Sequence, residues 1–529
     1  MADPGSKLAT HTVTNQPPAR GPRDLWASDP VLRCHAIGAD AGHLARHGRV
    51  LGSEDIADAA TEAHRVEPDL RVFDAGGRRL DEVRFAGGYH RLLKLGLGAG
   101  YAAGPWRGGQ HTTHAAMVYL HSQVEPGTCC PMTMTYAAIP ALAGSALAET
   151  WVPKLSAHAY DPSVKPIAQK TAATLGMAMT EKQGGSDVRA NTTRAERADG
   201  AWRLTGHKWF CSAPMSDGFL TLAQAPGGLS CFLVPRWLPE GRNAIHLMRL
   251  KDKLGNRANA SAEIEYHGAR AEMLGDEGDG VRRIIEMVHH TRLDTAMAPA
   301  GLMRAAIDHL RHWVTHRAAF GRPLIDQPLM RNVLADLVLT WEAATALGFR
   351  AARAFDDPEG RAFARIAVAL AKFLNNKWAV HVIAEALEAL GGAGYVEDHP
   401  LAMLYREAPL NGIWEGAGNV ICLDIRRSLE RDPETAAALD AALDGVRCAD
   451  AAYDRALATH RARWPGRPPE AEARAFADSA GRLLAAATLI EVAPPAVAEA
   501  YLATRITGTC GPIAGTHILN PAPLLARLA

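Results

Sequence analysis

A change in the pattern of apolar and turn residues between 173 and 273 constrains the fold of this chain more than any other feature. Four short segments in this region are apolar or partly alternating, and turn residues bound them: 201–210, 219–223, 229–234 and 262–266. Such segments are typical of β-strands, and Gly227-Gly228 and Gly255-Asn256 suit the turns between them. We therefore expect a small antiparallel β domain inserted in a chain that otherwise shows helical patterns.

Helical patterns precede and follow this β domain. Residues 141–152 form one such pattern, which Pro153 should stop. Residues 361–390 run almost unbroken to Gly391-Gly392, a suitable C-terminal stop. Residues 327–355 carry an apolar stripe at helical spacing, made of Leu329, Val333, Leu337, Trp341 and Ala344. We expect these long helices to pack side by side as a bundle.

The 529 residues are enough for about three or four domains of roughly 150 residues each. The expected parts are an extended N-terminal arm (1–30), an N-terminal helical domain (31–172), the β domain (173–273), a helical bundle (274–433) and a C-terminal helical domain (434–529). The arm is expected to be extended because Pro17-Pro18 and Gly21-Pro22 oppose a helix. The predicted fold class is therefore mainly α with a central antiparallel β domain.

Charge and cysteine usage narrow the function classes. The chain has 57 Lys+Arg and 57 Asp+Glu, which argues against a bulk electrostatic grip on nucleic acid but allows a local patch. The cysteines show no metal-binding spacing, so we expect no metal and reduced, mostly packed thiols among Cys34, Cys129, Cys130, Cys211, Cys231, Cys422, Cys448 and Cys510. No apolar run suits a membrane span or a signal peptide, so a cytoplasmic protein without membrane contact is expected.

Two segments near the β domain offer ligand chemistry. In 177–188, two glycines allow close approach of a ligand, and Thr180 and Ser186 offer hydroxyl groups. The alternative is an ordinary turn at a domain junction. In 206–212, Phe210 can cover a flat ring while Ser212 hydrogen-bonds its edge. The alternative there is an ordinary aromatic residue of a strand.

Two later segments carry charge. Arg317, in 317–327, suits a pyrophosphate because its guanidinium donates two hydrogen bonds in one plane. The alternative is an arginine that interacts with the dipole at a helix C-terminus. Glu415 lies beside Trp414 and Gly416, where partial desolvation would raise the carboxyl pKa and suit a general base. The alternative is an exposed glutamate of a surface loop.

The order and spacing of these four segments resemble the acyl-CoA dehydrogenase flavoprotein superfamily over residues 60–430. The AidB branch, associated with the adaptive response to DNA alkylation, is similar over nearly the whole chain. That similarity rests on 10–16 (THTVTNQ), 179–188 (MTEKQGGSDV), 250–256 (LKDKLGN) and 413–419 (IWEGAGN). The resemblance implies an acyl-CoA dehydrogenase-like fold, in which an α-helical domain, a β-barrel domain and a four-helix bundle are followed by an extra C-terminal helical domain.

The resemblance also implies one FAD per subunit of a homotetramer, bound between the β domain and the bundle. By position, the expected FAD contacts are Met179, Thr180, Gly185, Ser186, Phe210, Ser212, Arg317, Phe320, Gln327, Gly392, Trp414, Gly416 and Asn419. Of these, Arg317 and Gln327 would reach the FAD of a neighbouring subunit. Glu415 would be the base that removes the α-proton of an acyl-CoA thioester. Some members carry the base before an arginine on an earlier helix, but that position reads Thr291-Arg292 here.

The AidB branch further implies binding of double-stranded DNA through the C-terminal domain and protection against alkylation. Residues 426–529 contain 12 Arg, no Lys and 12 Asp+Glu, so DNA affinity would require a local patch. The expected patch is Arg426, Arg427, Arg461, Arg463 and Arg467, and the alternative is a solvated face. The preferred hypothesis is an AidB-like flavoprotein with weak or absent acyl-CoA activity. The alternatives are an ordinary metabolic dehydrogenase of a short or branched acyl-CoA, and a DNA-binding protein in which FAD is only structural.

Overall fold

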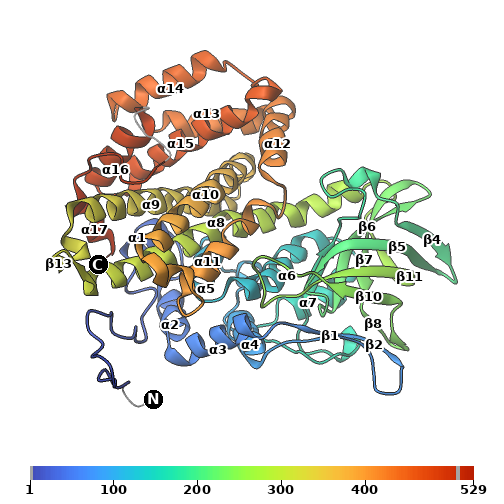
Figure 1. The fold of residues 1–529 in the computed structure, drawn as a ribbon. Coiled ribbons are helices and arrows are strands. Elements are labelled where there is room, and N and C mark those ends of the chain that lie inside the picture. The colour runs from blue at the N-terminus through green and yellow to red at the C-terminus, as the bar shows by residue number, and fades with distance from the viewer. Residues whose placement is uncertain (1–3, 508–512, 529) are drawn as a thin grey trace.

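The computed structural model describes residues 4–507 and 513–528. In Figure 1, the β domain projects from one side of the long helices, and the C-terminal helices cover them at the top. The N-terminal helices are α1 (Pro30–His35), α2 (Ala41–Leu51), α3 (Glu54–Arg65), α4 (Gly87–Gly98), α5 (His111–Ser122), α6 (Cys129–Leu142) and α7 (Leu147–Leu155). The hairpin of β1 (Asp69–Phe73) and β2 (Arg79–Arg84) interrupts them and has no counterpart in the sequence-based prediction.

The central domain is built on one twisted sheet. Its strands are β3 (Leu175–Ala178), β4 (Arg194–Ala198), β5 (Ala201–Ser212), β6 (Gly218–Ala225), β7 (Gly228–Pro235), β10 (Ile245–Leu250) and β11 (Ser261–Leu274), and β8 (Trp237–Leu238) and β9 (Gly241–Arg242) form a side hairpin. Most pairs are antiparallel, as predicted, but β3 runs parallel to β6. The four predicted segments, β5, β6, β7 and β11, pair antiparallel as expected. Strand β3, which was not predicted, enters from the helical domain in the same direction as β6.

Long helices form the bundle that supports the sheet. They are α8 (Gly280–His316), α9 (Pro328–Asp356), α10 (Arg361–Ala389), α11 (Pro400–Glu407) and α12 (Gly418–Arg431). The buried amide of Asn375 donates to the carbonyls of Ala296 and Ala344, both at 2.9 Å, so α10 is bonded to α8 and α9. A small hairpin, β12 (Ala318–Ala319) and β13 (Arg322–Pro323), joins α8 to α9.

The C-terminal domain is helical, as predicted. It contains α13 (Pro433–Asp444), α14 (Ala451–Arg463), α15 (Ala473–Val492), α16 (Pro495–Tyr501), a short π-helix (Leu502–Ile506) and α17 (Pro521–Leu525). Helix α15 packs on α9, α10 and α12, and the domain is therefore continuous with the bundle (Figure 1). Together these elements confirm the predicted fold class of helices around a central β domain with extra C-terminal helices.

Several local expectations were wrong. Residues 141–152 are not one helix, because the chain turns at Gly144 with φ 73° and Pro153 lies inside α7. Leu329, expected in the core stripe, is 75% exposed. The cysteine prediction holds in the described residues: Cys129, Cys130, Cys211, Cys231 and Cys422 are buried, Cys34 is half-buried and Cys448 is exposed. Cys510 lies outside the described residues.

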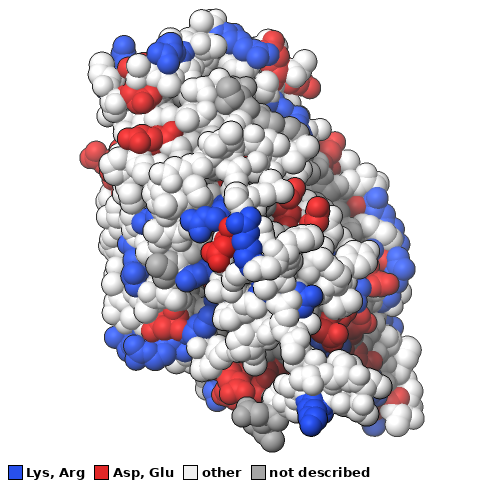
Figure 2. Space-filling view, turned by 60° about the vertical axis from the view of Figure 1, so that its left-hand side comes forward, with Lys and Arg blue, Asp and Glu red and all other residues white. Residues whose placement is uncertain are grey.

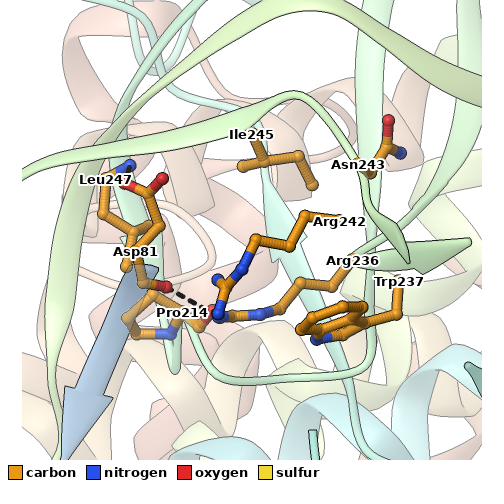
Figure 3. A pocket seen from close by; sticks show the side chains of 8 residues that line it. All are labelled: Asp81, Pro214, Arg236, Trp237, Arg242, Asn243, Ile245 and Leu247. Carbon is orange, nitrogen blue, oxygen red and sulfur yellow. Dashed lines mark hydrogen bonds between the residues drawn. The ribbon is translucent and has the colours of Figure 1, made fainter. Parts of the chain in front are cut away.

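A small cavity of about 10 Å³ lies in the β domain between the β1–β2 hairpin and the main sheet (Figure 3). Arg236 crosses it and donates to the carbonyls of Asp81, at 2.7 Å, and Pro214, at 2.6 Å. This volume is enough for one water molecule and too small for a cofactor. The hydrogen bonds of Arg236 across the cavity therefore have a structural role. No helix within residues 4–507 and 513–528 is long and apolar enough to cross a membrane.

Candidate functional site

The 179–188 loop begins where β3 ends and lies along β5. The Thr180 carbonyl accepts a hydrogen bond of 2.7 Å from the backbone N–H of Trp209 on β5. Glu181 and Gly184 exchange two backbone hydrogen bonds of 3.0 and 3.1 Å, which close the loop into a tight turn. A side chain at Gly185 would lie 3.2 Å from Thr180, so the glycine lets the turn pack against that residue. Met179 and Thr180 are half-buried, and Ser186 is exposed at the tip of the loop.

A buried ion pair fixes this loop to the sheet and was missed from the sequence. Lys208 on β5 donates to Glu181 at 2.8 Å, and both side chains are fully buried. Burial opposes ionisation of Glu181, but the Lys208 charge and several hydrogen bonds lower its pKa to about 2. Glu181 also accepts from the backbone N–H of Thr192 at 2.7 Å. The pair therefore orders the backbone that presents Thr180 and Gly185.

Strand β5 brings Phe210 and Ser212 beside the loop. The Phe210 ring is 46% exposed, and the Lys251 ammonium lies 4.7 Å from its centroid. The Ser212 hydroxyl lies 3.2 Å from the Ser261 hydroxyl on β11. An exposed aromatic ring next to a hydroxyl pair can cover one face of a flat ligand and bond its edge. The cofactor roles of Phe210 and Ser212 stay predictions.

Glu415 lies in a left-handed turn that two buried cations hold. The backbone has φ 56° at Glu415 and φ 107° at Gly416. Arg292 on α8 donates to the Glu415 carbonyl at 3.2 Å, and Lys372 on α10 donates to the Gly416 carbonyl at 2.8 Å. Asp424 on α12 accepts from Arg292 and fixes its guanidinium. A non-glycine residue at positive φ is uncommon and needs such support from its surroundings.

The Glu415 side chain is half-buried, and desolvation raises its pKa. A hydrogen bond from Thr291 and the charges of Arg292 and Lys372 oppose that rise. Burial, together with the Arg292 charge, lowers the pKa of Lys372 to about 7. From the sequence alone, Thr291-Arg292 shows only that the alternative base position of the family holds no carboxylate in this chain. The structure shows that Arg292 bonds the Glu415 turn directly.

Cys130 on α6 is buried, and its titration depends on the Glu415 turn and on the sheet. Burial raises the pKa of its thiol to about 12; the Lys253 charge and the Ser212 hydroxyl lower it, and the Glu415 charge raises it. Glu415 and Ser212 thus both influence this thiol, although they lie 203 positions apart in the sequence.

A second group of predicted residues meets elsewhere, in an open pocket of about 490 Å³. Its walls include Gln16, Trp313, Arg317, Leu324, Gly391, Gly392 and His399. None of the residues around Glu415 lines it. The β12–β13 turn beside the pocket leaves Phe320 98% exposed at φ 51°. Gln327 is half-buried and braces this hairpin by donating to the Ala319 carbonyl at 3.0 Å.

The remaining predicted contacts lie around the Glu415 turn. Trp414 is half-buried, and its backbone N–H donates to the Leu410 carbonyl at 3.1 Å. Asn419, in the first turn of α12, is exposed and accepts a hydrogen bond of 2.8 Å from Arg474. Arg474 belongs to α15, so the C-terminal domain reaches the segment that follows the base.

The arginines of the predicted DNA patch are largely paired with carboxylates. Arg461 bonds Asp444 at 2.8 Å, and Arg463 bonds Glu472 at 2.9 Å. Arg467 pairs with Glu430, Arg426 donates to the Pro468 carbonyl at 3.1 Å, and Arg427 lies 3.9 Å from Asp424. Figure 2 accordingly shows both signs of charge interspersed over the face that it presents. The structure does not produce a strongly positive surface from these residues.

Three family models match successive parts of the chain. The AidB N-terminal domain of the adaptive response protein matches residues 15–162, the acyl-CoA dehydrogenase middle domain matches 176–269, and the acyl-CoA dehydrogenase C-terminal domain matches 278–430. AidB of Escherichia coli strain K12 is 44% identical over 508 residues, which cover 93% of this chain and 94% of AidB.

Two solved structures extend these similarities to the whole fold. Caenorhabditis elegans ACDH-11 in complex with C11-CoA aligns with a TM-score of 0.85 and 28% identity, covering 95% of this chain and 94% of its own. The apo form of Bd2924 aligns with a TM-score of 0.80 and 30% identity, covering 89% of this chain and 98% of its own.

Proposed function

The chain belongs to the AidB branch of the acyl-CoA dehydrogenase superfamily, and on that premise we propose that it is a FAD-binding α,β-dehydrogenase of acyl-CoA thioesters with low activity. One observation carries the proposal. Glu415 occupies a left-handed turn whose carbonyls accept hydrogen bonds from the buried Arg292 and Lys372, and burial raises the pKa of its carboxyl group. A carboxylate that is held in place and has a raised pKa suits a general base.

The residues present fit FAD in two places. In the β domain, the partly exposed Phe210 ring and the Thr180 and Ser212 hydroxyls suit a flat heterocycle. In the open pocket, Arg317 suits a pyrophosphate, and Gly391 and Gly392 leave open space where any Cβ would stand. The pocket volume lies in the range of roughly 300–1,000 Å³ found for small-molecule sites. When bound, FAD supplies the acceptor for the hydride that α,β-dehydrogenation removes.

The chain itself supplies the proton chemistry. Glu415 would take the α-proton of the thioester onto its carboxylate. Its raised pKa makes it a stronger base than an exposed glutamate. Thr291, Arg292 and Lys372 oppose that rise and favour the ionised carboxylate. The two backbone hydrogen bonds to the turn keep the carboxylate in place as the proton moves.

We also propose a homotetramer. Large apolar side chains are exposed around the open pocket: Phe320 at 98%, Tyr395 at 81% and Leu329 at 75%. Such residues mark a surface that another chain covers. Association there would bring Arg317 and Gln327 against the FAD of a neighbouring subunit. Light scattering of the eluting protein measures the assembly directly, and a monomer would contradict this part of the proposal.

A second proposed role is the binding of double-stranded DNA and its protection against alkylation. The support is the likeness to AidB, which covers 93% of this chain and includes the C-terminal helices. Because Arg461, Arg463 and Arg467 are paired with carboxylates, phosphates must displace those partners. We therefore expect weak binding that is sensitive to salt.

Absorbance spectroscopy tests the enzymatic proposal. The purified protein should show an oxidised flavin spectrum that bleaches slowly under argon after addition of butyryl-, isovaleryl- or undecanoyl-CoA. The last thioester is included because the related ACDH-11 structure holds C11-CoA. The Glu415→Gln variant should retain the flavin and bleach at least about 100-fold more slowly, the usual scale for loss of a general base.

Other outcomes select other functions. Full bleaching by butyryl- or isovaleryl-CoA within seconds would identify an ordinary metabolic dehydrogenase of short or branched acyl-CoA. Flavin that stays oxidised with every thioester would leave FAD a structural role. Protein that neither carries nor takes up FAD would contradict the proposal as a whole.

A further inference from the structure

The N-terminal arm is bonded to the hairpin that carries Arg317. Asn15 adopts a left-handed conformation with φ 56°. Its amide nitrogen donates to the Ala318 carbonyl at 2.8 Å, and its amide oxygen accepts from the Ala318 N–H at 2.7 Å. The Asn15 carbonyl in turn accepts a hydrogen bond of 2.8 Å from the Arg317 guanidinium. One residue of the arm thus fixes both the backbone and the charged group of the hairpin.

Further contacts hold the arm along α8. His312 bonds the Pro18 carbonyl at 2.8 Å. Arg20 lies 3.4 Å from Asp308, which also pairs with Arg23. These partners explain how a segment rich in proline keeps a defined path without helix or sheet of its own. This path places Gln16, the residue that follows Asn15, in the wall of the open pocket.

Gln16 lines the pocket together with Arg317 and the two glycines of the 3₁₀ helix Gly391–Tyr395. Gln16 is exposed, and its amide makes no hydrogen bond within the described ranges. A glutamine amide offers two donors and one acceptor, which suit the polar edge of a purine or the hydroxyls of a ribose. The Arg317 guanidinium lies 5.3 Å from the centroid of the Trp313 ring, and its planar set of donors suits a diphosphate.

We propose that the N-terminal arm forms part of the cofactor site. In this arrangement Asn15 is a positioning residue that orients Arg317, and Gln16 closes the pocket over the adenosine diphosphate half of FAD. The inference rests on the proposed binding of FAD and assigns a role to a segment that lies outside the catalytic domains. It predicts that the arm affects ligands with an adenosine diphosphate moiety and leaves ligands without that moiety unaffected.

Three ligands test this prediction: FAD and ADP, which contain the adenosine diphosphate moiety, and FMN, which lacks the adenosine half. Their dissociation constants are measured by flavin fluorescence, or calorimetry for ADP, on the full-length protein stripped of cofactor. The variants are Gln16→Ala, which removes the amide, and Asn15→Gly, which removes the side-chain bonds but tolerates the left-handed backbone. Gln169→Ala is the matched control, because Gln169 is also exposed and does not line the pocket.

Each arm variant should raise the dissociation constants of FAD and ADP roughly fivefold, which is the scale expected for the loss of one hydrogen bond. FMN affinity and the thermal midpoint of the apoprotein should stay unchanged, and Gln169→Ala should match wild type with every probe. Unchanged FAD and ADP affinity in both arm variants would overturn the inference while wild-type FAD binding still supports the proposed function. Equal weakening of FMN would overturn it as well, by showing a general effect on folding. A wild-type protein that binds no FAD would overturn both.

Discussion

At the scale of single residues, Lys372 is the least expected member of the site. It lies in the middle of a long apolar helix and is almost fully buried. Its ammonium group bonds the Gly416 carbonyl at 2.8 Å, one residue beyond the base. Burying a charge is unfavourable unless it has a partner, so a lysine here implies a partner that offsets the desolvation. The Glu415 carboxylate and the Gly416 carbonyl together are that partner.

Replacing Lys372 should therefore change how Glu415 titrates. Removing the positive charge in Lys372→Met raises the pKa of Glu415, because that charge favours the ionised carboxylate. We expect the midpoint of the pH profile for flavin reduction by acyl-CoA to rise by about one unit. Stopped-flow absorbance at a series of pH values measures it. Lys377→Met is the control, since Lys377 lies on the same helix and is exposed. A pH profile identical to that of wild type would show that the Lys372 charge does not affect the titration of Glu415.

At the scale of elements, the junction between α6, α11 and the β10–β11 loop buries several titratable groups. Glu407, at the end of α11, accepts from the backbone N–H of Asn256 in that loop. Lys253 of the same loop bonds the Asn259 carbonyl at 2.5 Å. Burial, reinforced by the charge of Glu125, raises the pKa of Glu407 to about 7. Burial also lowers the pKa of Lys253 to about 8.

Glu407 should make the stability of this junction dependent on pH. Because its folded pKa lies above the ordinary 4.5, the folded protein keeps a proton between pH 4.5 and 7 that the unfolded chain loses. This stabilisation is complete below pH 4.5 and is lost as pH rises through 7. Between pH 5 and 8 the wild type should lose up to about 3 kcal/mol of unfolding free energy from this group, and Glu407→Gln should not.

Denaturant unfolding at pH 5 and pH 8 compares the two proteins. Glu388→Gln provides the control, because Glu388 is an exposed glutamate of α10. The control should follow wild type at both pH values. If Glu407→Gln also lost stability in parallel with wild type, the Glu407 carboxyl would have to be ionised in the folded protein.

At the scale of the whole molecule, the distribution of charge bears on the proposed binding of DNA. The C-terminal domain is neutral, and its candidate arginines are engaged by neighbouring carboxylates. The triple variant Arg461→Ala, Arg463→Ala and Arg467→Ala should weaken binding of a DNA duplex about tenfold or more. It should also reduce the salt slope by about three, because three phosphates would no longer be neutralised by arginine.

Fluorescence anisotropy at several salt concentrations measures both quantities. A matched control replaces Arg71, Arg78 and Arg84, three exposed arginines of the β1–β2 hairpin, by alanine. Its binding should equal that of wild type. Normal binding by the C-terminal variant would exclude this patch as the DNA surface, and equal weakening in both variants would indicate binding through general charge.

The sequence predicted much of this architecture because its signals are local. Strand alternation over 201–210 and the unbroken pattern over 361–390 report short-range preferences, and both elements formed as β5 and α10. The parallel pairing of β3 and the exposure of Leu329 were not predictable in this way. Each depends on which distant segment packs alongside, and that information is absent from local periodicity.

Local sequence patterns were sufficient to predict the helical and β regions, whereas the ligand segments and the base at Glu415 stay predictions. Those patterns could not show that Arg292 and Lys372 hold the Glu415 turn, or that Gln16 joins Arg317 in one pocket; the packed chain shows both. The physical reason is that hydrogen bonds, ion pairs and desolvation act over a few ångströms between residues hundreds of positions apart. Their effects on pKa and on ligand binding arise only after the chain has packed.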